Sequence, residues 1–380
     1  MSEQGKLTLG TIGLDAYSTT VEETDVLPKD QVAPVLMGLY GEVGGIMATA
    51  KKHVREGGAF PGYRVAAQEE FGDTLWYLAA YCRRQGISLE SIFSVATKQV
   101  PCASMVAASD LPNGAVAHVT TPAGSADIDQ TLFQLGRAAA TLLDAPPDPA
   151  STRARLGAFA ACYLSALQAA SFSFAEIARS NIAKVRGAFL SPDVLSLPRF
   201  DDEFSEEERI PSKFRIRINQ RTSGQSYLRW NDVFIGDPLT DNIGDPDGYR
   251  FHDVFHFAHA AILHWSPVFR ALIKQKRKSS ARHDEVEDGG RAIVVEEGLT
   301  AWIFSRAKDL NYFEGHERIS YGILKTIQEF TVGYEVALCP LKLWERAILQ
   351  GYAVFRRLRD GRGGWVEGDR ENRHLRFEPL

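Results

Sequence analysis

The feature that most constrains the fold is a long helical periodicity in the N-terminal half of the chain. From Pro28 to about Arg186, apolar residues recur three and four positions apart, and few stretches alternate as a strand would. Amphipathic helices bury their apolar faces against one another. We therefore expect a mainly α protein whose N-terminal part is a helical bundle.

The periodicity stops between residues 191 and 213, where the sequence reads SPDVLSLPRFDDEFSEEERIPSK. This stretch is rich in proline and acidic residues, which is typical of a domain boundary. A chain of 380 residues is also too long for one compact core. We predict an N-terminal domain at 12–190, a linker at 191–213 and a C-terminal domain at 214–380.

The C-terminal domain is predicted to be mostly helical with a small β-hairpin. FRIRINQR at 214–221 and SYLRWNDVFI at 226–235 both alternate, and TSGQ separates them. Helical patterns follow from about 249 to 359. The last residues, GWVEGDRENRHLRFEPL, favour a closing strand or an extended tail.

A weak internal repeat divides the N-terminal domain into two copies. LYGEVGGIMATA, which begins at Leu39, resembles QLGRAAATLLDA, which begins at Gln134. In the same order, FGDTLWYLAAYCRRQGISLESI resembles LGAFAACYLSALQAASFSFAEI. We interpret residues 12–100 as an active-like copy and residues 125–190 as a degenerate copy that packs against it as a pseudo-symmetric partner.

The second copy keeps the apolar pattern but loses the acids of the first. Arg137 corresponds to Glu42, and Ala158 corresponds approximately to Asp73. A purely structural role would give no reason for this one-sided loss. The repeat therefore indicates that the acids of the first copy carry chemistry.

Three carboxylates crowd into one stretch, AAQEEFGDTLWYLAAY, at residues 66–81. On a helix Asp73 lies over Glu69 and Glu70, while Phe71, Leu75, Leu78 and Cys82 form the opposite, buried stripe. The like charges repel, and on this argument alone Asp73→Asn should leave the metal-free fold as stable or more stable. A divalent cation such as Mg²⁺ would make the cluster favourable. The alternative is a solvated helix end, with the glutamates favoured by the helix dipole.

Composition excludes some classes of function. The formal net charge is −5, with 43 basic and 48 acidic residues, so there is no strong nucleic-acid signal. The four cysteines form no CxxC pair, which favours reduced thiols and a cytoplasmic location. Neither a signal peptide nor a long apolar run is recognisable, so we expect no membrane span.

Taken together, GLYGEVGGIMATAKK, EEFGDTLWYLA and GISLESI resemble the MazG-like, all-α nucleoside triphosphate pyrophosphohydrolase superfamily. Its pattern is a pair of glutamates on one helix, then a glutamate and an aspartate three residues apart on the next. SNIAKVRG at 180–187 resembles the ending of such domains. The likeness covers roughly residues 12–190.

The resemblance implies a Mg²⁺-dependent hydrolase that converts a nucleoside triphosphate to a monophosphate and pyrophosphate. It implies Glu42, Glu70 and Asp73 as metal ligands and Glu69 as the group that activates water, or as an acid behind the metal ligands. The expected substrate-binding residues are Lys51, Lys52, Trp76, Asn181 and Lys184. The two adjacent lysines also suit a helix C-terminus, and the tryptophan also suits a helical core.

One departure from the pattern concerns the second glutamate of the first helix. The position three residues after Glu42 is Gly45, so one expected ligand is missing. Because Mg²⁺ keeps several waters, three acids are enough to hold it. The alternative is a nucleotide sensor or interaction protein whose degraded site binds without hydrolysis.

A second candidate site lies in RFHDVFHFAHAAILHW at 250–265, where His252, His256 and His259 share one helical face and Asp253 adjoins the first. Such histidines are able to bind a transition metal, and Glu296 and Glu297 are candidate partners. The alternative is a set of histidines that satisfy buried hydrogen bonds or face solvent. Hydrolase activity carried by this C-terminal domain therefore remains a further hypothesis. The sequence leaves the base, the sugar and the oligomeric state open, a homo-oligomer included.

Overall fold

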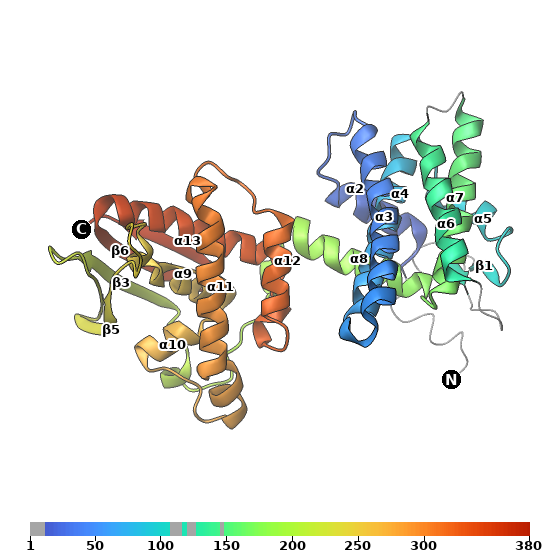
Figure 1. Ribbon diagram of the computed structural model, residues 1–380. Coiled ribbons are helices and arrows are strands. Elements are labelled where there is room, and N and C mark those ends of the chain that lie inside the picture. The colour runs from blue at the N-terminus through green and yellow to red at the C-terminus, as the bar shows by residue number, and fades with distance from the viewer. Residues whose placement is uncertain (1–11, 107–115, 120–126, 145–147) are drawn as a thin grey trace. The chain divides into compact units, whose positions relative to one another are not determined.

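The computed structural model describes residues 12–106, 116–119, 127–144 and 148–380 (Figure 1). The N-terminal residues 1–11, on which the expectation about a signal peptide partly rests, lie outside this set. The chain divides into two compact units, residues 1–190 and 191–380. The fold is mainly α with a small antiparallel sheet, which confirms the predicted fold class.

The described part of the first unit is built mainly from helices, with local signals at several of their starts. The Ser88 hydroxyl, the Asp127 carboxylate and the Asp148 carboxylate each accept hydrogen bonds from the first turn of the helix that follows. The helices are α2 (Leu14–Thr24), α3 (Ala33–Glu56), α4 (Tyr63–Arg84), α5 (Leu89–Ala96), α6 (Ile128–Leu143), α7 (Pro149–Ala169) and α8 (Phe174–Phe189).

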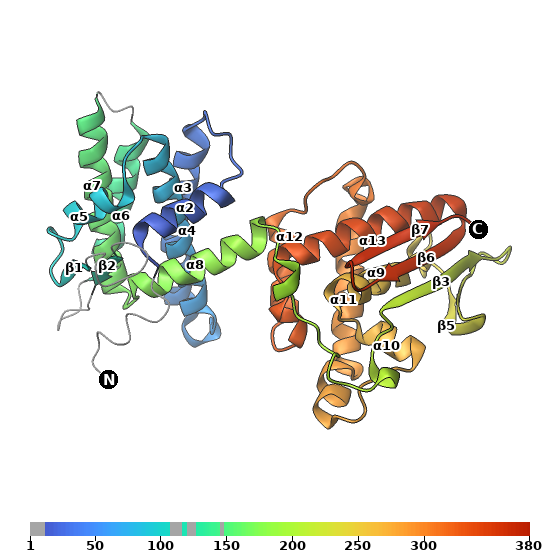
Figure 2. The same cartoon turned by 180° about the vertical axis from the view of Figure 1, so that it is seen from behind.

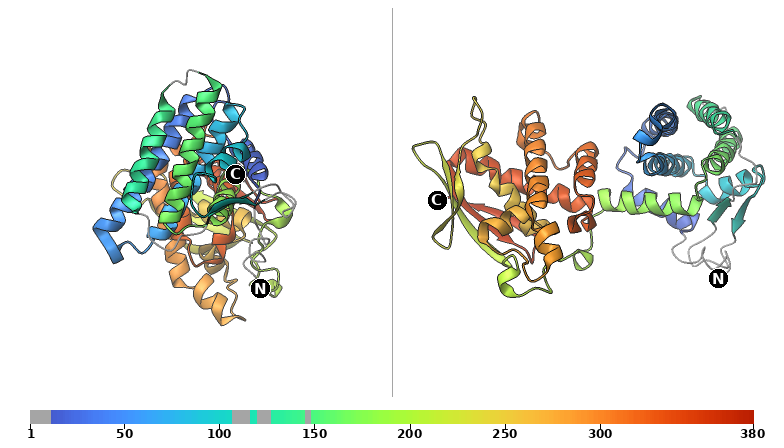
Figure 3. Two further views of the ribbon diagram at one scale, coloured as in Figure 1. Left: turned by 90° about the vertical axis from the view of Figure 1, so that its right-hand side faces the viewer. Right: turned by 60° about the horizontal axis from the view of Figure 1, so that its bottom comes forward.

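The two halves of this unit pack reciprocally. α3 packs on α4 and α6 packs on α7, while α3 also contacts α6. The last helix of each half then packs on the middle helix of the other, α5 on α7 and α8 on α4. The right panel of Figure 3 looks roughly along the long helices of this bundle. This exchange is the arrangement that two pseudo-symmetric copies would give.

Helix α4 lies at the centre of the unit and carries the predicted buried stripe. Phe71, Leu75, Leu78 and Cys82 are all at most 1% exposed. Burying each large apolar side chain contributes about 1.5–3 kcal/mol relative to leaving it in water. This stripe fixes the rotation of α4, and the acids consequently lie on the other side, toward α3 and α8.

A short antiparallel ladder in the first unit was not predicted. Strands β1 (Ala103–Val106) and β2 (Val116–Val119) pair from Ala103 opposite Val119 to Val106 opposite Val116. Each strand has only four residues, too few for a clear alternation.

The second unit combines a sheet with helices on it. The strands are β3 (Lys213–Gln220), β4 (Ser226–Trp230), β5 (Val233–Leu239), β6 (Gly363–Asp369) and β7 (His374–Glu378). The α-helices are α9 (Asp253–Ala258), α10 (Pro267–Ile273), α11 (Gly290–Lys308), α12 (Tyr321–Phe330) and α13 (Leu341–Gly361).

The sheet is fully antiparallel with the order β5-β4-β3-β6-β7. The predicted hairpin is its β3–β4 part, but the single second strand predicted at 226–235 is wrong: the chain turns at Asn231 and Asp232, both with positive φ, and returns as β5. The closing segment supplies β6 and β7 beside β3. Ile216 and Ile218 of β3 are fully buried and alternate with arginines, as the period of a half-buried strand requires. α13 and α9 pack against β6 and β7, and Figure 2 shows α13 alongside them.

The segment predicted as a linker, 191–213, packs on the second unit instead. Asp201 is fully buried there, with a carboxylate oxygen 2.6 Å from a guanidinium nitrogen of Arg270 and another 2.6 Å from one of Arg370. The Ile210 backbone N–H also donates to Asp201. The acid-rich composition looked like a linker because the arginines that pair with Asp201 lie far away in sequence.

The turns before the histidine segment are held by Asp241. Its carboxylate accepts two hydrogen bonds from the Arg250 guanidinium, both 2.7 Å long, and one from the Arg250 backbone N–H. Although burial alone would raise the pKa of Asp241, the hydrogen bonds from Arg250 lower it to about 2.

The histidine segment is not one regular helix. A 3₁₀ turn at Tyr249–Phe251 leads into the short α9, and a π-helical turn at His259–Leu263 follows. A π turn rotates the residues after it relative to an α-helix, and such turns are frequent at functional sites. The prediction of one helical face over His252, His256 and His259 therefore holds only approximately.

Within the described ranges, no individual helix has the length and apolar character needed to cross a bilayer. Helices α7 and α8 meet those criteria only when they are joined across a bend of 102°.

Candidate functional sites

The first candidate site lies where α3 faces α4. Glu42 of α3 and Glu70 of α4 share a side-chain hydrogen bond, which requires one of the two carboxyl groups to carry a proton. Burial raises the pKa of Glu42 to about 8, and the nearby charges of Asp73 and Glu70 act in the same direction. The predicted ligands Glu42, Glu70 and Asp73 are thus close enough to perturb one another.

Helix α8 completes this site with a lysine and an asparagine. The Lys184 ammonium lies 2.8 Å from a carboxylate oxygen of Glu69 and 2.5 Å from one of Asp73. The Asn181 side-chain amide donates to the other Asp73 oxygen at 3.0 Å. All three ion-paired side chains are only about one-fifth exposed. The structure therefore brings both predicted α8 residues to the acids of α4.

Tyr17 of α2 supports this arrangement from behind. Its hydroxyl donates to the Asn181 side-chain oxygen at 2.8 Å, and Tyr17 is 1% exposed. This bond orients the Asn181 amide nitrogen toward Asp73. Sequence reasoning missed Tyr17, and its only local signal is a tyrosine on the apolar face of a helix.

The space that a side chain at position 45 would occupy is already taken by Glu70. A Cβ atom added to Gly45 would lie 2.1 Å from a carboxylate oxygen of Glu70, whereas one added to the preceding Gly44 would meet nothing within 4 Å. The Glu70 carboxylate thus fills the space that a side chain at position 45 would need. Gly45 lets this ligand approach α3 closely.

The donor set of this cluster fits a hard divalent cation. Glu42, Glu69, Glu70 and Asp73 supply only oxygen ligands, which Mg²⁺ prefers, and the single ammonium of Lys184 leaves excess negative charge. Burial is the main cause of the raised pKa of Glu42, and the negative charges of Asp73 and Glu70 raise it further.

The other predicted substrate-binding residues lie away from this arrangement. Trp76 is 9% exposed in the core, and its indole N–H donates to the Thr24 hydroxyl, so we remove it from the site. Lys51 is nine residues beyond Glu42 on α3, about 14 Å along the helix. Lys52 lies over the Phe60 ring near the C-terminal end of α3. This position fits the alternative interpretation, in which the two lysines are favoured by the dipole at a helix C-terminus.

The second candidate site is the histidine cluster of α9 and α11. His252, Asp253 and His256 each offer a ligand atom within 4.8 Å of the others, and so do His256, His259 and Glu296. One carboxylate oxygen of Glu297 lies 3.4 Å from His256 Nε2 and 3.7 Å from His252 Nε2. The predicted second-site residues are therefore brought together.

Glu296 is the structural centre of that cluster and is fully buried. Its carboxylate accepts hydrogen bonds from the Ser266 hydroxyl at 2.8 and 3.0 Å, the Val268 backbone N–H at 3.0 Å and His259 Nδ1 at 2.9 Å. Ser266 was missed by the sequence interpretation, although a serine before a proline-initiated apolar helix is a recognisable N-cap.

The charges of this cluster perturb one another strongly. Burial alone would lower the pKa of His256, but the charge of Glu296 overcomes it and raises the pKa to about 10. Burial likewise would raise the pKa of Glu296, yet His256 lowers it to about 2. Burial raises the pKa of Asp253. In the absence of a metal ion, a proton on His256 balances the buried carboxylates.

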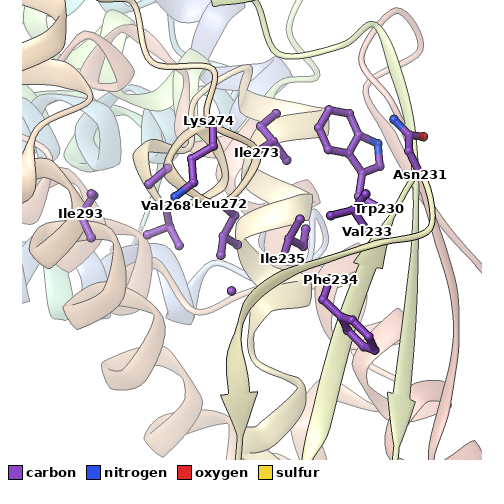
Figure 4. Close-up of a pocket in the computed structure, with 12 residues that line it drawn as sticks. Trp230, Asn231, Val233, Phe234, Ile235, Val268, Leu272, Ile273, Lys274 and Ile293 are labelled. Atoms are coloured by element: carbon purple, nitrogen blue, oxygen red, sulfur yellow. The ribbon is translucent and has the colours of Figure 1, made fainter.

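A pocket of about 630 Å³ lies elsewhere in the second unit, between β4, β5 and α10 (Figure 4). Mostly apolar side chains line it, among them Val233, Ile235 and Leu272, and Lys274 is the one charged residue of its lining. It contains none of the acids or histidines described above. The pocket therefore offers neither metal ligands nor a phosphate-binding cluster.

Comparison with known proteins gives one family match. Residues 195–380 match the family model of the MazG C-terminal domain, which covers the second unit and none of the first. Searches of curated proteins and of solved structures found no match. The C-terminal region is therefore related to MazG proteins.

Proposed function

We propose that the first unit hydrolyses a nucleoside triphosphate to a monophosphate and pyrophosphate in a Mg²⁺-dependent reaction. The observation that carries this proposal is the cluster of four carboxylates from the facing helices α3 and α4, completed by Lys184 and Asn181 of α8. The match of the second unit to the MazG C-terminal domain supports a nucleotide-related role. A cytoplasmic location would place the protein beside such substrates.

In this proposal Glu42, Glu70 and Asp73 hold the Mg²⁺. When bound, the ion supplies positive charge that neutralises the triphosphate. Three carboxylates leave room for water and phosphate oxygens around such an ion. The Asn181 amide and the Lys184 ammonium fix the two oxygens of Asp73.

Glu69 is the proposed general base for the attacking water. Its oxygen is held by Lys184 at 2.8 Å, so the carboxylate is oriented before substrate arrives. In this proposal Lys184 also pairs with the phosphate groups, and binding of a triphosphate there would release Glu69 to accept a proton.

A second candidate function is a nucleotide sensor that binds without hydrolysis. Gly45 favours it, because the position offers no carboxylate and its space is filled by Glu70. The sensor would use the same acids and the same Mg²⁺, and only the chemical step would be absent.

The test is a screen of the full-length protein against canonical and modified nucleoside triphosphates, with Mg²⁺ or with EDTA, in which pyrophosphate and phosphate are detected separately. We expect Mg²⁺-dependent pyrophosphate release that Glu69→Gln abolishes and that the matched variant Glu176→Gln retains, since Glu176 is exposed in the first turn of α8. Mg²⁺-dependent nucleotide binding without release would select the sensor. Activity that survives Glu69→Gln and Asp73→Asn would assign the hydrolysis to the C-terminal domain.

A further inference from the structure

We propose that the second unit contains a binding site for a divalent transition-metal ion, formed by His252, Asp253, His256 and Glu297. This inference concerns a different unit from the proposed pyrophosphohydrolase site and stands without it. The donor set is two imidazoles and two carboxylates, which suits Zn²⁺ and its first-row neighbours better than Mg²⁺.

The spacing of the ligand atoms fits such an ion. Ligands about 2.1 Å from a tetrahedral ion lie about 3.4 Å from one another. The Glu297 oxygen lies 3.4 Å from His256 Nε2 and 3.7 Å from His252 Nε2, and Asp253 offers an oxygen within 4.8 Å of ligand atoms of both histidines. Glu297 and Asp253 each lie near both histidines, so in this proposal side-chain movements place all four on one ion.

The orientation of His252 prepares it for metal binding. Its Nδ1 lies 2.9 Å from the backbone carbonyl of Tyr249, and its ring stacks on the Tyr249 ring at 4.3 Å. A carbonyl only accepts, so Nδ1 carries a hydrogen, and Nε2 is then the nitrogen whose lone pair the neutral ring offers to a metal. A hydrogen bond of this kind, from the nitrogen that does not bind the metal, is the usual support of a metal-binding histidine.

The surroundings of His256 give a second sign that a cation fits at this place. It is 0% exposed, and neither of its ring nitrogens has a hydrogen-bond partner among the described residues. Oxygens of Glu296 and Glu297 lie 3.0 and 3.4 Å from these nitrogens, but without the alignment of a hydrogen bond. Buried polar atoms are normally satisfied, and an ion at Nε2 would satisfy one of them.

Glu296 is not a metal ligand in this proposal but positions His256. Each of its oxygens already accepts two hydrogen bonds, Oε1 from Ser266 and His259 and Oε2 from Ser266 and the Val268 backbone, so it is a poor direct ligand. It lies beside His256 Nδ1, where it would hold that ring while Nε2 faces the ion. For this reason we prefer the set with Asp253 and Glu297 over the set of His256, His259 and Glu296.

The site also has access to solvent. The Glu297 side chain is 39% exposed, whereas those of His252 and His256 are 11% and 0% exposed. An ion would enter past Glu297, and an exchangeable ligand would bind on that side. The 3₁₀ turn before α9 and the π turn after it hold the histidine segment in a non-regular conformation, as in many functional sites.

The experiment measures metal binding by the full-length protein after removal of metals with a chelator. Titrations with Zn²⁺ by calorimetry, and with Co²⁺ by visible absorption, are carried out in excess Mg²⁺ so that the oxygen-only cluster of the first unit is occupied. We expect one ion per chain, with the Co²⁺ spectrum of a four-coordinate site. His252→Gln and Glu297→Gln should each weaken binding about tenfold or more.

Matched variants separate this site from the rest of the chain. His316→Gln removes an exposed histidine outside the cluster and should bind Zn²⁺ as the wild type does. Circular dichroism establishes that each variant is folded, and the partly exposed Glu297 keeps the test independent of the fully buried His256. The proposal would be overturned if the protein bound neither Zn²⁺ nor Co²⁺. It would also be overturned if Asp73→Asn abolished binding while His252→Gln and Glu297→Gln both left it unchanged.

Discussion

Replacing Asp73 with asparagine tests whether the negative charge of Asp73 stabilises or destabilises the metal-free fold. If repulsion from Glu69 and Glu70 were its only interaction, neutralising Asp73 would stabilise the metal-free protein. The structure reverses this expectation, because Asp73 accepts from both the Lys184 ammonium and the Asn181 amide. Asparagine has the same shape, but its amide nitrogen would have to face one of these donors.

The size of the effect follows from the burial of the pair. At an effective dielectric constant of about 20, unit charges about 3 Å apart attract by about 5–6 kcal/mol, and desolvation cancels most of this. Exposed pairs contribute about 0–1 kcal/mol, and breaking a buried one costs about 3–5 kcal/mol. The Lys184 and Asp73 side chains are 20% and 22% exposed, so a loss of about 2 kcal/mol is expected.

Relief of repulsion does not offset that loss. Of the neighbouring acids, Glu42 has a pKa raised to about 8 and is mostly protonated near neutral pH, while Glu69 shares the Lys184 ammonium with Asp73. Removing the Asp73 charge therefore relieves little repulsion. With Mg²⁺ at a hundred times its dissociation constant, the wild type should gain about 2.7 kcal/mol, and the variant should gain much less.

The assay must report on the first unit alone. Trp76 is the single tryptophan among the first 190 residues of the sequence, and the other five lie beyond it, so fluorescence follows mainly the second unit. Hydrogen exchange of peptides from α4 and α8, in EDTA and in Mg²⁺, gives the opening free energy of this region. Asp129→Asn, at an exposed acid in the first turn of α6, is the control for the change in charge.

Two results would refute the reasoning. If Asp73→Asn is as stable as the wild type in EDTA, the Lys184 pair contributes nothing and the repulsion argument from the sequence holds. If Mg²⁺ stabilises both proteins equally, no ion is bound through Asp73.

Three further outcomes follow from single residues. Gly45→Ala should displace the Glu70 carboxylate and reduce the Mg²⁺-induced stabilisation. Gly44→Ala should leave that response unchanged and stabilise α3 by up to about 1 kcal/mol, and hydrogen exchange of α3 and α4 peptides measures both effects. Asp201→Asn should cost about 3–5 kcal/mol, because it removes the carboxylate that pairs with buried Arg370 and leaves Arg270 with the more distant Asp288 at 3.6 Å. The exposed Asp202→Asn should cost little in the same urea titration. The lowered pKa of Asp241 contributes about 2 kcal/mol to the free energy of unfolding above pH 3.8, and this contribution is lost as the pH falls toward about 2. An acid titration in which Asp241→Asn loses as much stability as the wild type would contradict this.

The interpretation of Trp76 shows where local pattern stops being informative. The sequence placed it on an acid-bearing helix, where stacking on a base and packing in a core were both open. Because α4 contacts α2, α3 and α8, most of its circumference is covered, and the indole lies in the core with its N–H bound to Thr24. Periodicity measures one apolar stripe and does not reveal how many neighbours a helix has.

The sequence alone determined the features that depend on short-range spacing. The helical bundle, the buried stripe of α4 and the strand alternation of β3 all follow from residues two to four positions apart, because that spacing decides which side chains share a face. The same rule placed Glu69, Glu70 and Asp73 together. Resemblance, and not spacing, added Asn181 and Lys184.

Only the tertiary structure decided which distant groups meet. Lys184 pairs with Asp73 from 111 positions away, and Asp201 is neutralised by arginines 69 and 169 positions away. His256 meets two carboxylates only because α11 brings Glu296 and Glu297 to α9. The sequence specifies the charge of each side chain. Its partner and its burial depend on how whole helices and strands pack, so these contacts cannot be predicted from local spacing.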